Sequence, residues 1–594
     1  MNRESRKCQN CHQEFWIEPE DFNFYKKIDV PPPTWCPECR MQRRMAYRNE
    51  RTLYKRDCDK CGRSMIAAYP KTTKFTIYCA DCWWGDSWDP MDYGKEYDSS
   101  KIFFEQWKEL QNRMPRPYVN NLPGTAMLNS EYTNCAGQLK NCYLVYGAMR
   151  NEDCAYSHYL NYSRHCFDNL YSIKNESCYE CLDIENCYGL MYSQSCLGCR
   201  DSMFLYDCRN CSDCIGCAGL RNKKYHILNK SHTKEEYFKK KEELKLHTRE
   251  GLKLFRGKYM KEVYYSSPRK YYHGQMNKSF SGDYIANVEN THRSFYIKNA
   301  RGCKFVFWCN NAKDVYDYMS WGDLEFSYEC VSNGYNSYHC MFSDACWSDN
   351  KDIEYCSLCF TSSDLFGCIG LRSKQYCILN RQYSEEEYKA LREKIVKEMT
   401  ENPYRDSRGI AYPYGEFPPV EFSPFLYRDT VAQEHYPLTK EEVIKNNFRW
   451  DEPEERNHKV TVNPESLPGL IEKVGDSILQ EVIGCAHKGE CEDQCTEAFK
   501  ITAQELAFYR KMNIPLPQFC YNCRHAGRVA LRNPLKLWHR KCQCTGEKSE
   551  NNIYKNTATH QHGAGACPNE FETSYSPERK EIVYCEQCYQ AEVV

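Results

Sequence analysis

No apolar run in this chain reaches the roughly eighteen residues that a membrane-spanning helix needs. The opening residues MNRESRKCQN also lack the apolar core of a secretory signal. Charge of one sign is not in excess, because 80 basic residues stand against 81 acidic ones. We therefore expect a cytoplasmic protein that does not associate with membranes. Any contact with nucleic acid must be made by a local surface.

Cysteine, in contrast, is abundant, with 40 residues in a chain of 594 that is long enough for several domains. In a reducing cytosol, paired cysteines are read as metal ligands rather than as disulfides. The two ends of the chain carry the same module. The segment FWIEPEDFNFYKKIDVPPPTWCPEC corresponds to FKITAQELAFYRKMNIPLPQFCYNC, and RMAYRNERTLYKRDC corresponds to RVALRNPLKLWHRKC, each 484 positions later.

Each copy of this module predicts two metal sites of four cysteines. Four thiolates fill the tetrahedral shell of zinc and leave no open position, which is typical of a structural site. We therefore expect four structural zinc ions per chain and no catalytic or cofactor-binding residue. The predicted ligand sets are Cys8, Cys11, Cys36 and Cys39; Cys58, Cys61, Cys79 and Cys82; Cys491, Cys495, Cys520 and Cys523; and Cys542, Cys567, Cys585 and Cys588.

Other side chains near the fourth site leave alternatives. Cys544 can replace Cys542 as a ligand, although the 484-residue register favours Cys542. His560 and His562 lie in the insertion THQHGAGAC, where they can touch a metal ion, but a flexible loop is the interpretation that we favour.

The middle of the chain is also duplicated, since GCAGLRNKKYHILN returns as GCIGLRSKQYCILN. All twelve cysteines from Cys142 to Cys217 fall in one phase of a three-residue repeat, and the pair Cys178 and Cys181 recurs after eighteen positions and again after another eighteen. This pattern predicts a narrow parallel β-solenoid with inward thiols and coils of about eighteen residues. The cysteines of the second copy do not keep one phase of the three-residue repeat, which predicts looser or longer coils there. Capping boxes at Thr233 and Ser384 predict a helix after each copy.

The predicted fold is therefore mixed and mainly β, with two terminal double-zinc modules of treble-clef or zinc-ribbon type flanking two short parallel β-solenoids with C-terminal capping helices. The predicted boundaries are 1–98 for the first double zinc module, 99–230 for the first solenoid, 231–265 for a helix and linker, 266–380 for the second solenoid, 381–400 for a helix, 401–470 for a proline-rich extended arm and 471–594 for the second double zinc module.

A basic helix is expected directly after the second cysteine pair in each copy. Three arginines at intervals of four share one helix face, and the shift of 484 superimposes the two rows. Guanidinium forks suit phosphate oxygens, so the rows predict a non-enzymatic scaffold associated with RNA or the ribosome. The alternative is that the arginines pair with local acids or with the solenoid. The rows are Arg40, Arg44 and Arg48, and Arg524, Arg528 and Arg532.

Two other functions remain open. The first is a protein-interaction or assembly scaffold built on the tyrosine-rich solenoids. The second is an iron–sulfur redox protein, because the spacing C-x2-C-x2-C also begins cluster loops, although the trailing Cys-Pro is missing. No constellation of acid, base and nucleophile is present, so we expect no enzyme. The oligomeric state stays open. The cluster-like run is Cys208, Cys211, Cys214 and Cys217.

Several segments resemble a known group of proteins. ITAQELAFYRKMNIPLP, ALRNPLKLWHRKC and IVYCEQCYQ near the C-terminus, with GCIGLRSKQYCILN in the middle, resemble cysteine-rich zinc-ribbon proteins of small uncultured bacteria. The resemblance extends over the full length. It implies no activity, because none is established for that group, and function must come from the residues.

Overall fold

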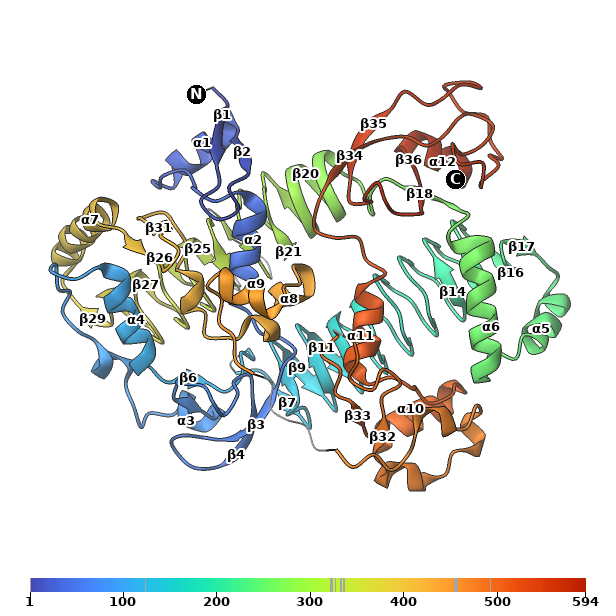
Figure 1. Cartoon of the computed structure of the whole chain (residues 1–594), viewed down its shortest axis with the longest axis horizontal. Helices are drawn as coiled ribbons and strands as arrows, with labels where there is room; N and C mark the ends of the chain where they lie inside the picture. The colour runs from blue at the N-terminus through green and yellow to red at the C-terminus, as the bar shows by residue number, and fades with distance from the viewer. Residues whose placement is uncertain are drawn as a thin grey trace. The chain divides into compact units, whose positions relative to one another are not determined.

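The computed structural model describes residues 2–122, 124–320, 324–325, 327–331, 334, 337–452, 458–491 and 493–593, and is mixed and strand-rich (Figure 1). The chain divides into two compact units. The first joins Met1–Asn120 to His273–Glu452, and the second joins Asn121–Tyr272 to Pro453–Val594. Each unit therefore combines one terminal cysteine module with the central repeat that is more distant in the sequence.

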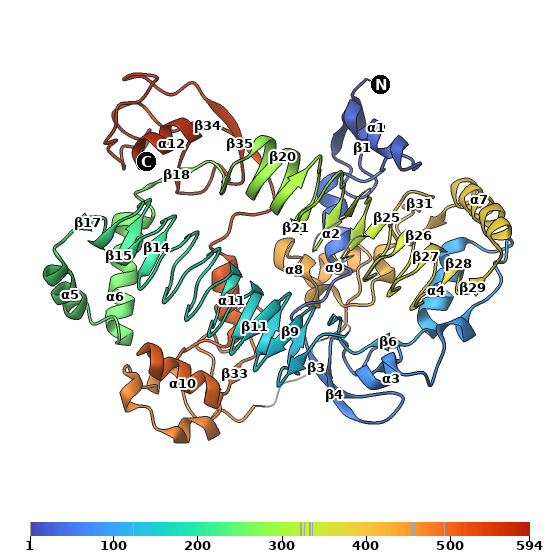
Figure 2. The same ribbon diagram turned by 180° about the vertical axis from the view of Figure 1, so that it is seen from behind.

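The repeat of the second unit, which we call the first ladder (127–231), is built from parallel pairs of short strands, except that its last strand, Lys230–Ser231, pairs antiparallel with Lys224–Ile227. Val145 pairs with Ser157, and Leu205 pairs with Cys217, so each residue lies beside the residue twelve positions later. Figure 2 shows these strands side by side from β9 to β15. The strands are β7 (Met127–Leu128), β8 (Thr133–Asn134), β9 (Gly137–Lys140), β10 (Tyr143–Tyr146), β11 (Met149–Glu152), β12 (Ala155–Asn161), β13 (Leu170–Ile173), β14 (Met203–Tyr206), β15 (Ser212–Ala218), β16 (Lys224–Ile227) and β17 (Lys230–Ser231).

The step of twelve residues corrects the step of eighteen predicted from the cysteine spacing. Isolated bridges such as Phe167 with Tyr179 continue the same step through the middle of the ladder. Twelve and eighteen are both multiples of three, so either keeps the cysteines in one inward phase. Eighteen residues make one and a half turns, and the recurring cysteine pairs are therefore half a turn apart rather than stacked.

The three-residue phase has a backbone cause. The residue before each inward position has a left-handed conformation, as at Tyr156, Tyr159 and Tyr162 with φ of 55°, 53° and 53°. This conformation costs about 1–2 kcal/mol for most side chains, and it turns the chain every third residue. Small inward groups fill the narrow core, where the thiol of Cys154 lies 3.2 Å from the Glu152 carbonyl oxygen. Thiols thus fill the core and satisfy backbone acceptors.

The repeat of the first unit, the second ladder (274–382), winds in the same way but with steps of eleven to thirteen residues, the shortest between Gly274 and Ile285. Phe295 pairs with Phe307 twelve positions later, whereas Cys340 pairs with Ile353 thirteen positions later. The longer step accounts for the phase slips of the cysteines. Its strands are β19 (Gly274–Gln275), β20 (Lys278–Arg301), β21 (Phe307–Asn310), β22 (Tyr318–Met319), β23 (Leu324–Glu325), β24 (Cys330–Val331), β25 (Ser337–Met341), β26 (Lys351–Glu354), β27 (Ser363–Phe366), β28 (Gln375–Ile378) and β29 (Arg381–Gln382).

Helices follow each ladder at the predicted caps. The Thr233 hydroxyl accepts from the Glu236 amide at 3.2 Å and opens α5 (Lys234–Glu243), which precedes α6 (Arg249–Tyr259). Ser384 opens α7 (Glu385–Glu401) in the same way. Phe255 of α6 packs on Phe204 of the ladder, with ring centroids 5.4 Å apart. None of the helices in the described ranges is long and apolar enough to cross a membrane.

The cysteine modules consist of short hairpins and helices. The first unit has β1 (Glu4–Lys7), β2 (Glu14–Ile17), α1 (Pro19–Lys27), α2 (Pro37–Met45), β3 (Tyr54–Asp57), β4 (Ser64–Ala67), β5 (Ile77–Tyr78), α3 (Ala80–Trp84), α4 (Phe103–Arg113) and β6 (Arg116–Pro117). The second has β32 (Ile483–Gly484), β33 (Ala498–Phe499), α10 (Ala503–Met512), α11 (Tyr521–Val529), β34 (Trp538–Lys541), β35 (Glu570–Thr573), β36 (Ile582–Tyr584), which pairs with β18 (Pro268–Lys270), and α12 (Glu586–Val593).

The proline-rich segment contributes to the core of the first unit. It carries β30 (Tyr404–Arg405), β31 (Ala411–Tyr412), α8 (Val431–His435) and α9 (Lys440–Lys445), with irregular chain between them. Tyr412 and Phe417 are buried in the same apolar cluster as Trp35 and Tyr47 of the cysteine module. The part of this segment that the structure describes up to Glu452 is thus packed against its unit.

Candidate metal centres

Two four-cysteine groups lie in the first unit, as the sequence predicts. In each group the ligand atoms all lie within 4.8 Å of one another. A hairpin turn carries one cysteine pair, and the start of α2 or α3 carries the other. The Cys36 amide donates to Cys8 Sγ at 3.2 Å, and the Cys79 amide donates to Cys58 Sγ at 3.3 Å. Helix N-termini and amide donors stabilise thiolates, the form that binds metal.

In the second unit the fourth predicted group is present, and the third has a different member. Cys485, rather than the predicted Cys491, stands with Cys495, Cys520 and Cys523 in a four-cysteine group. The Cys520 amide donates to Cys485 Sγ at 3.3 Å, as the Cys36 amide donates to Cys8. We therefore correct the assignment of Cys491. Its Sγ lies 3.6 Å from Cys523 Sγ as an additional thiol beside the group.

The reason for this error is an insertion. The first and second ligands of the third group are Cys485 and Cys495, whereas the equivalent Cys8 and Cys11 are separated by two residues. The nearest cysteine in register was Cys491, which lies inside the inserted segment. The insertion between Cys542 and Cys567, the first two ligands of the fourth group, was a signal that inserted segments can separate the first two ligands of a site.

Replacing Cys485 and Cys491 one at a time separates their roles. Cys485→Ser should lose one zinc ion per chain, because it removes one of the four ligands. Cys491→Ser should retain the zinc content and thermal midpoint of the parent protein. Elemental analysis and calorimetry of both variants measure this difference. Loss of zinc from Cys491→Ser alone would restore the assignment made from the sequence.

Electrostatics in three groups favours at least one thiolate. The Cys523 thiol, 3.5 Å away, lowers the pKa of Cys520 to about 4. A hydrogen bond with Cys542 lowers the pKa of Cys585 to about 4. Burial opposes ionisation of Cys79, but the Arg63 guanidinium, 3.2 Å from its Sγ, helps to lower its pKa to about 6. These groups suit a divalent ion that prefers thiolate ligands.

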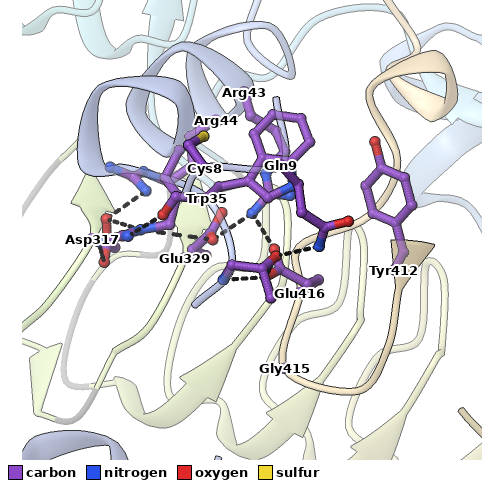
Figure 3. A network of polar contacts seen from close by, with 12 residues as sticks. Cys8, Gln9, Trp35, Arg43, Arg44, Asp317, Glu329, Tyr412, Gly415 and Glu416 are labelled. Atoms are coloured by element: carbon purple, nitrogen blue, oxygen red, sulfur yellow. Dashed lines mark hydrogen bonds and ion pairs between the residues drawn. The ribbon is translucent and has the colours of Figure 1, made fainter. Parts of the chain in front are cut away.

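The predicted arginine row of the first unit is buried. Arg40 donates through Nε and Nη2 to both carboxylate oxygens of Asp317 at 3.0 and 2.9 Å, and Arg44 donates to the same carboxylate at 2.9 Å. Both arginines are 1% exposed, and Asp317 is fully buried. Figure 3 shows the Arg44 side chain reaching from α2 to Asp317 on the second ladder. Arg48, beyond the end of α2, pairs with Glu50.

The second unit repeats this arrangement. Arg524 Nε and Arg528 Nη1 each lie 3.0 Å from Asp168 of the first ladder. Arg524 Nη1 donates to the Phe519 carbonyl at 3.2 Å, as Arg40 Nη1 donates to the equivalent Trp35 carbonyl at 2.7 Å. The module therefore docks on its ladder through the same two arginines and one aspartate in both units.

The expectation that the rows present guanidinium groups to phosphate is therefore wrong for this structure. Arg524, Arg528 and Arg532 are 7%, 4% and 7% exposed, and Arg532 donates to the Tyr171 hydroxyl at 3.1 Å. Burial with a paired carboxylate leaves no solvent-facing surface for a nucleic acid backbone. The arginines instead pair with local acids or with residues of the repeat, which is the alternative given in the sequence analysis.

The first unit adds a third arginine, which has no equivalent in the second. Arg43 Nη2 donates to Glu329 at 2.5 Å and to Glu416 at 2.9 Å (Figure 3). Burial raises the pKa of the Glu329 carboxyl to about 7, against the opposing charge of Arg43. Glu416 belongs to the proline-rich segment, so the network ties that segment, the cysteine module and the second ladder together. The corresponding position in the second unit is Gly527.

The cysteine run considered for an iron–sulfur cluster lies inside the first ladder. All four side chains are 0–1% exposed. Each Sγ lies 3.3–3.5 Å from the carbonyl oxygen two residues earlier, as a thiol donor would. They form part of the same inward columns as the other cysteines. These residues are Cys208, Cys211, Cys214 and Cys217.

The insertion in the fourth site brings further donor atoms together. Cys544, His560 and His562 gather with Cys588, which differs from the flexible loop that the sequence predicts for the two histidines. The sequence signals were the short spacings Cys-x-Cys and His-x-His, which carry little weight alone.

The chain was compared with known proteins. No protein-family model matches it, and no curated protein matches it.

Proposed function

We propose that this chain is a non-enzymatic scaffold, stabilised by structural zinc, that binds a protein partner along the outer face of the first ladder. In this proposal the ladders act as parallel β-solenoids and the terminal modules as zinc-ribbon or treble-clef-like clamps. Burial of the arginine rows removes the main argument for RNA that the sequence offers. Support for a protein partner comes from a shallow groove of about 840 Å³ on the first ladder.

The chemistry of the groove is mixed. Four cations and three carboxylates line it, and its two exposed tyrosines, Tyr162 and Tyr188, are each 47% exposed. Tyrosine and arginine are enriched among residues that dominate protein–protein binding energy. Interleaved charges favour a partner that carries both signs over a uniform polyanion. The charged residues are Arg150, Glu152, Arg164, Lys174, Glu176, Arg200 and Asp201.

The groove is also preorganised. The Arg150 guanidinium lies 5.4 Å from the Tyr162 ring centroid, and Arg164 lies 3.5 Å from Glu152 on the neighbouring coil. Because the ladder spaces these side chains at fixed steps of twelve residues, little ordering is needed when a partner binds.

Truncation of the two groove tyrosines tests this proposal. A photo-crosslinking residue at position 162 of the full chain in its native cell identifies the bound partner, and its affinity is then measured. Tyr162→Ala with Tyr188→Ala should weaken binding at least about tenfold, since hot-spot truncations cost about 2 kcal/mol or more. Tyr132→Ala, a similarly exposed tyrosine on the same ladder but outside the groove, should change affinity less than about twofold. Equal effects of both changes would contradict the proposal.

RNA binding remains a second candidate because of a different surface. A cavity of about 660 Å³ in the second unit is lined by four cations and one acid, with Tyr265 and Ile553 exposed beside them. If the crosslinked partner is RNA, the salt dependence of binding should fall by about 0.7 per removed cation when Lys261 and Lys580 are replaced by Gln. The charged lining residues are Lys261, Arg540, Arg579, Lys580 and Glu581.

A further inference from the structure

We propose that an additional zinc ion binds beside the fourth four-cysteine site, held by Cys544, His560, His562 and Cys588. The four ligand atoms all lie within 4.8 Å of one another. Cys588 also belongs to the four-cysteine group, so its thiolate bridges two ions. The inference therefore rests on zinc in the neighbouring site, as in the proposed function.

The distances around Cys588 fit a shared thiolate. Its Sγ lies 3.7 Å from Cys567 Sγ on the side of the four-cysteine group and 3.3 Å from His562 Nε2 on the other side. Cys544 and Cys588 are 0% and 2% exposed, and His560 is 5% exposed. Two thiolates and two imidazoles, almost enclosed, make a complete tetrahedral zinc shell with no open position. The role is structural rather than catalytic.

Both histidines are oriented as metal ligands usually are. His562 Nδ1 lies 3.0 Å from the Gly565 carbonyl oxygen, which can only accept, so Nδ1 carries the proton and Nε2 has its lone pair beside Cys588. His560 Nε2 lies 2.9 Å from Glu592 Oε1, which leaves Nδ1 as the nitrogen with a lone pair. An outer hydrogen bond from one ring nitrogen to a carbonyl or carboxylate is the usual device that fixes a ligating imidazole.

Glu592 is itself held in place by the inserted segment. Its carboxylate accepts from the Thr557 amide at 2.8 Å, the Thr557 hydroxyl at 2.9 Å and the Tyr554 hydroxyl at 2.9 Å. Because Glu592 lies on α12 with Cys588, these bonds fix the insertion against the helix that supplies the shared thiolate. The second site of the first unit has no such insertion between Cys58 and Cys61. The added ligands therefore come with the added segment.

Native mass spectrometry of the intact wild-type chain, with elemental analysis, tests the proposal. We expect five zinc ions per chain, four in the four-cysteine groups and one here. His560→Ala with His562→Ala, and separately Cys544→Ser, should each lose one ion and keep four. His539→Ala, an exposed histidine on β34 of the same module, should lose none.

Three results would overturn the proposal. The first is a wild-type chain with four ions, which leaves the proposed four-site function intact. The second is a pair of histidine and cysteine variants that keep the full wild-type count. The third is a wild-type chain with fewer than four zinc ions, together with a Cys542→Ser variant that holds the same number. The four-cysteine site beside the proposed one would then hold no zinc, and the Cys588 thiolate would have no second ion to bridge. The wild-type count requires no variant, so it remains decisive if a variant fails to fold.

Discussion

Removal of zinc by a strong chelator should unfold both cysteine modules while the ladders keep their backbone hydrogen bonds. Structural zinc sites contribute about 10–16 kcal/mol each in peptide models, which is large beside the apolar packing around the smaller sites. The second site, for example, lies near a buried cluster of only four residues, Ala68, Tyr69, Phe75 and Ile77. The ladders instead pair each coil with the next through amide and carbonyl groups that need no metal.

Hydrogen exchange followed by mass spectrometry measures this effect segment by segment. After chelation, amides in 2–98 and 493–593 should exchange rapidly, whereas those in 137–227 should stay protected. Added zinc should restore protection, and added magnesium, which prefers oxygen ligands, should not. Unchanged exchange in the modules would show that their folds do not depend on metal.

Loss of either docking aspartate should have the second large effect. Asp168→Ala leaves Arg524 and Arg528 buried without their shared carboxylate, and breaking a buried ion pair in this way costs about 3–5 kcal/mol. Asp317→Ala should act on Arg40 and Arg44 of the first unit in the same way. The free energy of opening, obtained from hydrogen exchange of each unit in urea, measures the loss.

Two comparisons make this prediction specific. Asp153→Ala removes a partly exposed carboxylate of the same ladder, 3.7 Å from His165, and should cost about 1 kcal/mol or less. Adding Arg524→Met and Arg528→Met to Asp168→Ala should recover part of the loss, because no unpaired guanidinium then remains buried. A cost for Asp168→Ala equal to that of Asp153→Ala would mean that the pair does not hold the module on its ladder.

Local patterns in the sequence predicted the parts of the molecule that depend on local geometry. The cysteine pairs of the first and second groups follow from short spacings, and those of the fourth group follow from the 484-residue register. The inward phase of the ladders follows from a left-handed residue at every third position. The coil length did not follow, because steps of twelve and eighteen residues both preserve a phase of three. Pairing between coils decides between them, and that is a tertiary property.

The placement of the arginines depended on residues far away in the chain. Arg40 and Asp317 are 277 positions apart, and Arg524 and Asp168 are 356 positions apart. The basic segment after Cys523 has no acid of its own, so it resembles a solvent-exposed phosphate-binding helix. Only the docking of each module on the more distant repeat reveals the partner carboxylates.

The central claim is that zinc held by four-cysteine groups stabilises both modules of this scaffold. Elemental analysis of zinc and iron in the protein purified from its native cell tests it most directly. The account predicts at least four zinc ions per chain, five with the site at Cys544, and no iron. About two zinc ions, or a brown protein with iron in place of zinc, would contradict it and favour a redox protein.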